Sequence, residues 1–364
     1  MMISNTLLKS TLDGIKAIAK IDLFLFDPDG NMIYATEEPD ERCESWAREF
    51  VASEADTQSM SDIHFIKVKD KGSAAYVLAA SGAGDETMVF LKLAAFQLQS
   101  MVNSDKDRFD KDNFLKNVIL DNLLQIDIYE RSRKFHVDNE TPRLVYVIGV
   151  KDDSDNAVLD VLRPLYGENT GGFVFKVDEQ HIIYIRSIAE GENETDFTAV
   201  AENVLDTIST ECQQEVCISY GNPAPELKDL SRSYKEAGLA MDVGKIFYED
   251  LRIMAYSKLG IGRLIYQLPI TLCRMFINEV FGEHDPTDLD EETIQTIDQF
   301  FADSLNISEA SRNLYIHRNT LVYRLDKLEK TLGLNIRNFD DAMTLKIALM
   351  VDTYMNYIEK NHDR

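Results

Sequence analysis

The residues best suited to chemistry lie close together near the C-terminus, between positions 306 and 330. Arg and Asn side chains at the start of a helix match base edges in the major groove, since guanidinium pairs with guanine and amide with adenine. Basic side chains farther along the same helix suit phosphates. The candidates are Arg318 and Asn319 for base edges, Thr320, Tyr323 and Arg324 for bases or phosphates, Arg312 and Lys327 for the phosphate backbone, and His317, which either donates to a phosphate or caps the helix.

Two short helices joined by a tight turn are predicted to position these side chains. Asn306 can cap a first helix that runs to about Leu314, because its side chain accepts from the first free backbone N–H groups. Tyr315 to His317 make the turn, and a second helix starts at about Arg318. Its apolar stripe, Leu321, Leu325 and Leu328, has i, i+4, i+7 spacing and packs on the first helix. The pattern predicts a helix-turn-helix, and the spacing alone leaves open an ordinary solvated hairpin in a helical bundle.

The charge of this segment differs from that of the whole chain. The 364 residues contain 38 Lys and Arg against 63 Asp and Glu, a net charge of −25, so bulk attraction cannot explain binding to a polyanion. Residues 311–330 instead hold five basic side chains against Asp326 and Glu329, a net charge of +3. Charges more than about 8 Å away are largely screened at physiological ionic strength, so a local positive surface is sufficient.

The run Leu314 to Leu325, LYIHRNTLVYRL, followed by Gly333-Leu334, resembles the C-terminal helix-turn-helix of the PucR/CdaR family of bacterial transcriptional regulators. The likeness extends upstream through Thr293, Ile297, Phe300 and Phe301 and downstream into an apolar final helix at about 342–357. Ser311 departs from the usual alanine but is small enough to pack between the helices. The resemblance implies binding to double-stranded DNA, activation of a catabolic or transport operon, RNA polymerase as a partner of an activator, and a small-molecule inducer. Sugar diacids, glycerate and purine or amino-acid metabolites are among the inducers of relatives.

Residues 113–257 read as alternating strands and helices in the order βαββαβα. Strands are expected at 144–150, 173–177, 181–185 and 216–220, with helices at 114–124, 157–165, 197–209 and 226–241. This order resembles a degenerate, ferredoxin-like GGDEF domain. The hairpin reads Lys176-Val177-Asp178-Glu179 where a nucleotidyl cyclase needs a glycine pair, and the first strand lacks an acidic residue. We therefore expect no catalytic residues, no metal and no cofactor, with a nucleotidyl cyclase or a non-DNA-binding scaffold as the alternatives.

Residues 1–102 read as short antiparallel strands with helices packed on one side. Strand pairs are predicted at 22–26 with 32–35 and at 63–68 with 74–80, and the Asp29-Gly30 pair suits the first turn. The layout is analogous to PAS and GAF sensor modules. A dimerisation or spacer domain without a ligand fits equally well, and no ligand-contact residue can be named.

Together these features predict an α+β multidomain protein. Its parts are a PAS/GAF-like sensor module (1–102), a linker that interrupts a helix (103–112), a ferredoxin-like, GGDEF-like domain (113–257), connecting helices (258–281), an acidic linker (282–292) and an all-α helix-turn-helix domain (293–364). Four isolated cysteines and the lack of a long apolar run or secretory signal favour a cytoplasmic protein with reduced thiols and no membrane partner. A homodimer or higher homo-oligomer is expected, with apolar residues between Met88 and Met101 as a candidate pairing surface.

Overall fold

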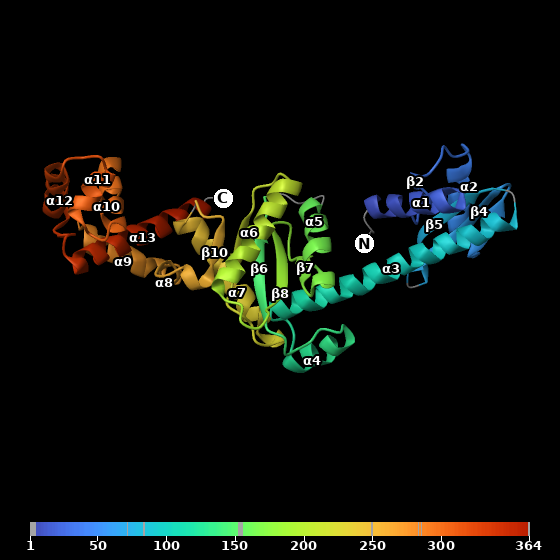
Figure 1. The fold of residues 1–364 in the computed structure, drawn as a ribbon, viewed down its shortest axis with the longest axis horizontal. Coiled ribbons are helices and arrows are strands. Elements are labelled where there is room, and N and C mark those ends of the chain that lie inside the picture. Colours follow the sequence, from blue (N-terminus) through green and yellow to red (C-terminus); the bar gives the residue numbers. More distant parts are fainter. Residues whose placement is uncertain are drawn as a thin grey trace. The chain divides into compact units, whose positions relative to one another are not determined.

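The computed structural model describes residues 5–70, 72–82, 84–151, 156–248, 250–282, 284 and 286–362. Its contacts divide the chain into two units, Met1–Phe114 and Leu115–Arg364. Figure 1 shows the order of the elements along the chain. The predicted mixed α+β class, with two sheets and a helical C-terminal part, is confirmed.

The N-terminal unit is built on a five-stranded antiparallel sheet with the strand order β2-β1-β5-β4-β3. The prediction that helices cover only one side of this sheet is wrong. Apolar residues of α1 and α3 pack on one face, and those of α2 pack on the other. The elements are α1 (Asn5–Ala19), β1 (Asp22–Phe26), β2 (Met32–Ala35), α2 (Cys43–Ala52), β3 (Thr57–Met60), β4 (Ile63–Asp70), β5 (Ser73–Ser81) and the start of α3 (Asp85–Ile119).

The predicted break at 103–112 does not occur, because α3 runs without interruption from Asp85 to Ile119. The segment is polar, but it contains neither Gly nor Pro, and charged residues such as Asp107, Arg108 and Asp110 stay exposed on the helix surface. Polarity here marks exposure of the helix and not its end. The boundary between the two units falls within α3, at Phe114–Leu115.

The first part of the second unit confirms the ferredoxin-like order. The sheet order β10-β9-β6-β8-β7 contains the βαββαβ core, with β10 added parallel to β9. Helices α5 and α6 supply apolar side chains to one core of this sheet, and α7 contacts β6 and β9. The elements are α4 (Gln125–Lys134), β6 (Arg143–Gly149), α5 (Ala157–Tyr166), β7 (Phe173–Lys176), β8 (His181–Ser187), α6 (Glu194–Glu211), β9 (Cys217–Tyr220), α7 (Leu230–Phe247) and β10 (Ile253–Ala255).

Helices form the remainder of the second unit around a single apolar core. The predicted connecting helices are present as α8 and α9, and the acidic segment ends in α10, which begins two residues earlier than expected. Residues 283 and 285 of that acidic segment lie outside the described residues. The helices are α8 (Gly262–Ile265), α9 (Ile270–Phe281), α10 (Glu291–Ala302), α11 (Ile307–Asn313), α12 (Arg318–Leu332) and α13 (Phe339–His362).

Among the described residues, no helix combines the length and the apolar character needed to cross a membrane.

Candidate nucleic-acid interface

Helices α11 and α12 form the predicted hairpin. The Asn306 side chain accepts from the backbone N–H groups of Ser308 and Glu309, at 3.0 and 3.3 Å, and so caps α11. The leucine stripe of α12 is buried, with Leu321 fully enclosed and Leu325 and Leu328 no more than 4% exposed. Burial of this stripe against α10, α11 and α13 fixes which face of α12 points to solvent.

Ser311 occupies the closely packed position that the sequence assigned to it. It is 7% exposed, and its hydroxyl donates to the carbonyl of Ser308 at 3.2 Å. The departure from alanine is therefore accommodated by a hydrogen bond within α11.

His317 caps the second helix, which is one of the two roles expected for it. Its Nδ1 accepts from the backbone N–H of Asn319 at 3.2 Å. In the neutral ring this assignment puts the proton on Nε2, which leaves an N–H donor on an exposed side chain at the start of α12. Capping and phosphate donation are thus compatible in a single residue.

Most of the other candidate residues share the exposed surface of the hairpin. Their side chains form no hydrogen bond or ion pair with any other residue that the structure describes, and Tyr323 is 68% exposed. These residues are Arg312, Arg318, Asn319, Thr320, Tyr323 and Lys327. These side chains are hydrogen-bond donors exposed to solvent, so they are available to a binding partner.

Arg324 is placed differently from the other candidates. Its Nη1 donates to the Thr296 hydroxyl at 3.0 Å, and its Nη2 pairs with the Glu292 carboxylate, so that it joins α12 to α10. Only 21% of its side chain is exposed. The position on the flank of α12, next to the buried stripe, explains why the guanidinium reaches α10 and not the solvent face.

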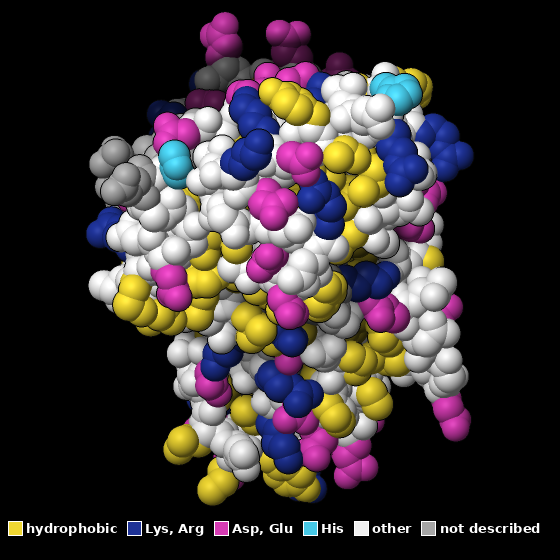
Figure 2. Space-filling model, turned by 90° about the vertical axis from the view of Figure 1, so that its left-hand side faces the viewer, with side chains coloured by type: hydrophobic (Ala, Val, Ile, Leu, Met, Phe, Trp, Pro, Cys, Tyr) yellow, Lys and Arg dark blue, Asp and Glu magenta, His cyan; other side chains and the backbone are white. Residues whose placement is uncertain are grey.

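The two acidic residues of the 311–330 segment are neutralised within the domain. Arg337 pairs with Asp326, and its Nη1 lies 3.2 Å from the Glu329 carboxylate. These carboxylates therefore subtract less from the local positive potential than the sequence count suggests. In the space-filling view toward this end of the chain, Lys and Arg side chains gather beside histidine and apolar side chains (Figure 2).

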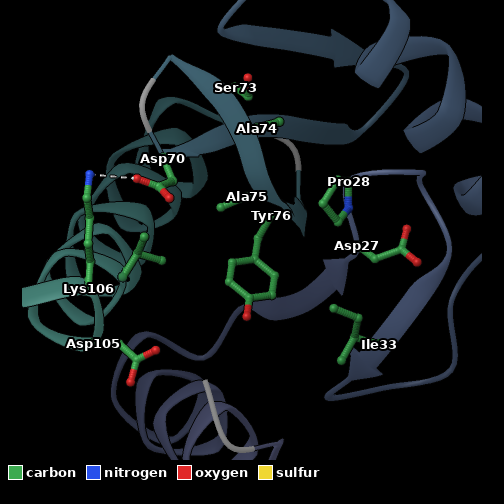
Figure 3. Close-up of a pocket in the computed structure, with 11 residues that line it drawn as sticks. Asp27, Pro28, Ile33, Asp70, Ser73, Ala74, Ala75, Tyr76, Asp105 and Lys106 are labelled. Atoms are coloured by element: carbon green, nitrogen blue, oxygen red, sulfur yellow. Dashed lines mark hydrogen bonds and ion pairs between the residues drawn. The ribbon is translucent and has the colours of Figure 1, made fainter. Parts of the chain in front are cut away.

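A second candidate site is a cavity of about 340 Å³ in the N-terminal unit, between the end of β1, the start of β5 and α3 (Figure 3). The Tyr76 ring lies in the middle of it, with the ion pair of Lys106 and Asp70, 3.1 Å apart, on one side. The sequence alone gives no signal for this cavity, because its walls come from segments far apart in the chain. The lining residues are Asp27, Pro28, Ile33, Asp70, Ser73, Ala74, Ala75, Tyr76, Val102, Asp105 and Lys106.

Comparison with known proteins agrees with this geometry. Residues 293–351 match the PucR C-terminal helix-turn-helix domain, and residues 121–243 match a GGDEF-like domain. The chain combines a PucR-type helix-turn-helix domain with a GGDEF-like domain, a combination consistent with the PucR/CdaR family. The resemblance noted in the sequence is thereby confirmed, and α10 to α12 are the family's helix-turn-helix.

Several relatives of this chain are named as regulatory proteins. It is 23% identical to the Carbohydrate diacid regulator of Escherichia coli, over 78% of this chain and 77% of that protein. It is 27% identical to the Purine catabolism regulatory protein of Bacillus subtilis, over 39% of this chain but only 27% of that protein. The Proline-responsive transcriptional activator PutR of Bacillus subtilis is 27% identical over 37% of this chain and 34% of its own length.

Among solved structures, the Regulator of Polyketide Synthase Expression from Bifidobacterium adolescentis aligns with a TM-score of 0.31. The sequences are 15% identical, and the alignment covers 65% of this chain and 95% of that one.

The turn between β7 and β8 in the GGDEF-like domain holds Asp178, an acidic residue next to the Lys176-Val177 pair that replaces the glycines. Asp178 accepts from the backbone N–H of Gln180 at 2.8 Å and contacts Nδ1 of His181 at 2.9 Å. Partial burial raises the pKa of Asp178, but the hydrogen bonds from His181 and Gln180 outweigh it and leave the pKa below 3.8. The Val177 carbonyl accepts from Lys116 of α3. Asp178 thus fills a structural role in the turn.

Proposed function

We propose that this chain is a transcriptional regulator that binds double-stranded DNA by placing α12 in the major groove. The observation that carries the proposal is the exposed, unpaired set of donors on a capped helix whose opposite face is fixed by a buried leucine stripe. Such a helix meets DNA with its side chains already positioned, and its N-terminal residues are the ones that reach base edges in helix-turn-helix proteins.

Within this interface, Arg318 and Asn319 read base edges, because they lie at the N-terminal end of α12. Thr320 and Tyr323 follow on the exposed face and contact bases or phosphates. Arg312, His317 and Lys327 contribute phosphate contacts. Arg324, which the sequence suggested for bases or phosphates, instead braces α12 against α10 through its bonds to Thr296 and Glu292.

The experiment that tests DNA binding is selection of a preferred duplex from a randomised DNA pool with the full chain. Affinity for the selected duplex is then compared with affinity for unrelated DNA at a stated salt concentration, since phosphate contacts alone give binding without preference. A preference of at least about a thousandfold supports the proposal. Equal affinity for both duplexes contradicts it.

A homodimer is part of the proposal, because one such helix reads only a short half-site and paired half-sites about one helical turn apart need two modules. Three apolar residues of α3 within the predicted contact region are exposed in the single chain: Val89 at 56%, Leu93 at 59% and Phe96 at 72%. Their i, i+4, i+7 spacing puts them on one side of the helix. Light scattering of the full chain, alone and bound to the selected duplex, tests this, and a monomer bound at a single half-site contradicts it.

The inducer is proposed to bind in the cavity beside Tyr76 in the N-terminal unit. Its volume lies at the small end of the range for ligand sites, which suits a metabolite. The lining includes the carboxylates of Asp27, Asp70 and Asp105. Asp70 pairs with Lys106 and Asp105 pairs with Arg108, which leaves Asp27 as the carboxylate with no ion pair to a described residue. Burial raises the pKa of Asp27, but hydrogen bonds from Asn31 outweigh it and keep the pKa below 3.8, so this carboxylate is charged at neutral pH. The cavity therefore favours an uncharged or cationic metabolite over the sugar diacids of some relatives.

Thermal unfolding of the full chain with added ligands tests this assignment. A sugar diacid, a purine and an amino acid with a basic side chain are compared, because a ligand that binds the folded state raises the unfolding temperature. The stabilising ligand should lose its effect in Ala75→Phe, which fills the cavity. Stabilisation by the sugar diacid that persists in Ala75→Phe contradicts the proposed site.

Activation is the proposed output, with RNA polymerase as the partner of the DNA-bound regulator, since one relative, PutR, is named as a transcriptional activator. The chain is proposed not to be an enzyme, because Lys176 and Val177 stand where a cyclase needs glycines. Incubation with GTP and Mg²⁺ or Mn²⁺ is expected to give no cyclic dinucleotide.

A further inference from the structure

Tyr315, in the turn between α11 and α12, has an unusual combination of backbone geometry and exposure. Its φ is +57°, in the left-handed region, and its side chain is 95% exposed. A bulky residue rarely adopts this backbone conformation, which glycine adopts without steric cost. Within the described part of the chain, the side chain forms no hydrogen bond or aromatic ring contact that could offset this cost.

The backbone geometry itself has a local explanation. The N–H of Tyr315 donates to the Arg312 carbonyl at 3.1 Å, and the N–H of Ile316 donates to the Ser311 carbonyl at 3.0 Å. These two bonds form a Schellman motif that satisfies the last carbonyls of α11, and glycine is the usual residue at the left-handed position of this motif. The chain has glycine in the left-handed conformation at the end of α12, where Gly333 has a φ of +71°, but the same two bonds are made with a polar residue at the left-handed position after α4 (His136) and after α10 (Ser304). Capping explains the left-handed turn at 315 but does not explain a tyrosine there.

The position of Tyr315 indicates what the phenol contacts. It lies between the last turn of α11, where Arg312 is exposed, and the first turn of α12, where Arg318 is exposed. In a helix-turn-helix bound to DNA, the first helix crosses the sugar-phosphate backbone while the second enters the groove, so the turn between them faces the backbone. Tyrosine hydroxyls are among the groups that donate to phosphate oxygens there.

We infer that Tyr315 is a DNA-contacting residue whose hydroxyl donates a hydrogen bond to a backbone phosphate at the edge of the groove. The contact rests on the DNA-binding function proposed above. It positions α12 without selecting a base, because phosphates carry no sequence information directly. The left-handed backbone directs the ring away from the hairpin and toward the bound duplex.

The test compares Tyr315→Gly, Tyr315→Asn and Tyr315→Phe in the full chain. Gly and Asn suit the left-handed backbone, so their unfolding temperatures should equal or exceed that of the unsubstituted protein. All three variants should bind the selected duplex about 10- to 150-fold more weakly, as expected for loss of one hydrogen bond to a charged group. The dependence of affinity on salt should keep its slope, because an uncharged phenol releases no counterion.

Gln213→Gly is the matched control. Gln213 is also exposed, has a φ of +53° and follows a helix end, that of α6, but it lies outside the DNA-binding domain. Its replacement should leave DNA affinity unchanged. Undiminished binding by Tyr315→Gly overturns the inference, and undiminished binding by Tyr315→Phe overturns the hydroxyl-to-phosphate contact. If the unsubstituted chain shows no preferred duplex, the failure lies instead with the proposed function.

Discussion

Replacement of Arg324 by alanine tests whether this residue stabilises the packing of α12 on α10 or contacts DNA. Arg324 belongs to a basic stretch of the sequence, yet its guanidinium is held by Thr296 and Glu292 of α10. If this arrangement persists on DNA, Arg324→Ala weakens the packing of α12 on α10 and leaves the reading surface intact. The expected result is a loss of stability with little change in affinity.

The size of the effect follows from the two contacts. Thr296 is only 2% exposed, and a hydrogen bond to it from a charged group contributes roughly 1.5–3 kcal/mol. The Glu292 side chain is 67% exposed, so solvent screening limits the ion pair to about 0–1 kcal/mol. Because the two contacts share one guanidinium and are not additive, we expect a loss of about 2 kcal/mol in the opening free energy of α10 to α12.

Hydrogen exchange measured segment by segment in the full chain is the suitable assay, since a multidomain chain does not unfold in one step. Lys327→Ala is the matched control, because Lys327 lies on the same helix, is exposed and has no ion pair with a described residue; its effect on exchange should stay within about 0.5 kcal/mol. Affinity for the selected duplex should change less than about twofold in Arg324→Ala. Unchanged exchange with a tenfold loss of affinity refutes the packing role and makes Arg324 a DNA contact.

Three further predictions concern the same domain. Lys327→Ala should weaken binding to all duplexes alike and reduce the slope of affinity against salt by about 1, as measured by titration at several salt concentrations. The Leu325 side chain is only 2% exposed, so Leu325→Ala leaves a cavity in the core of the domain. This should lower the opening free energy of α10 to α12, measured by hydrogen exchange, by about 2–5 kcal/mol. Hydrogen bonds from Thr293 hold the pKa of Asp290 below 3.8, so its stabilisation of α10 is complete above about pH 4 and is lost as the pH falls through the lowered value. In Asp290→Asn, exchange in α10 should lose this acid dependence.

Local patterns in the sequence were sufficient for the elements that carry the proposed function. The cap at Asn306, the leucine spacing of α12 and the strands at 22–26 and 32–35 all depend on neighbouring residues, and the structure has them where they were predicted. The order of the GGDEF-like core was also predictable, because each strand and helix has its own periodicity.

Features that depend on distant residues were not predictable in this way. The three-residue strand β10 exists only because it pairs with β9, and the cavity beside Tyr76 is closed by α3. The role of Arg324 depends on where α10 lies, which no pattern within α12 specifies. The predicted linker at 103–112 is wrong for another reason. A polar composition indicates solvent exposure, and the surface of helix α3 is as exposed as a linker.

The most direct measurement of the central claim is the affinity of Arg318→Ala for the selected duplex and for duplexes altered one base pair at a time. Loss of a bidentate base contact should weaken binding by about 1–3 kcal/mol and abolish discrimination at one base pair of each half-site. Unchanged affinity and unchanged discrimination at every position would show that the start of α12 does not read DNA.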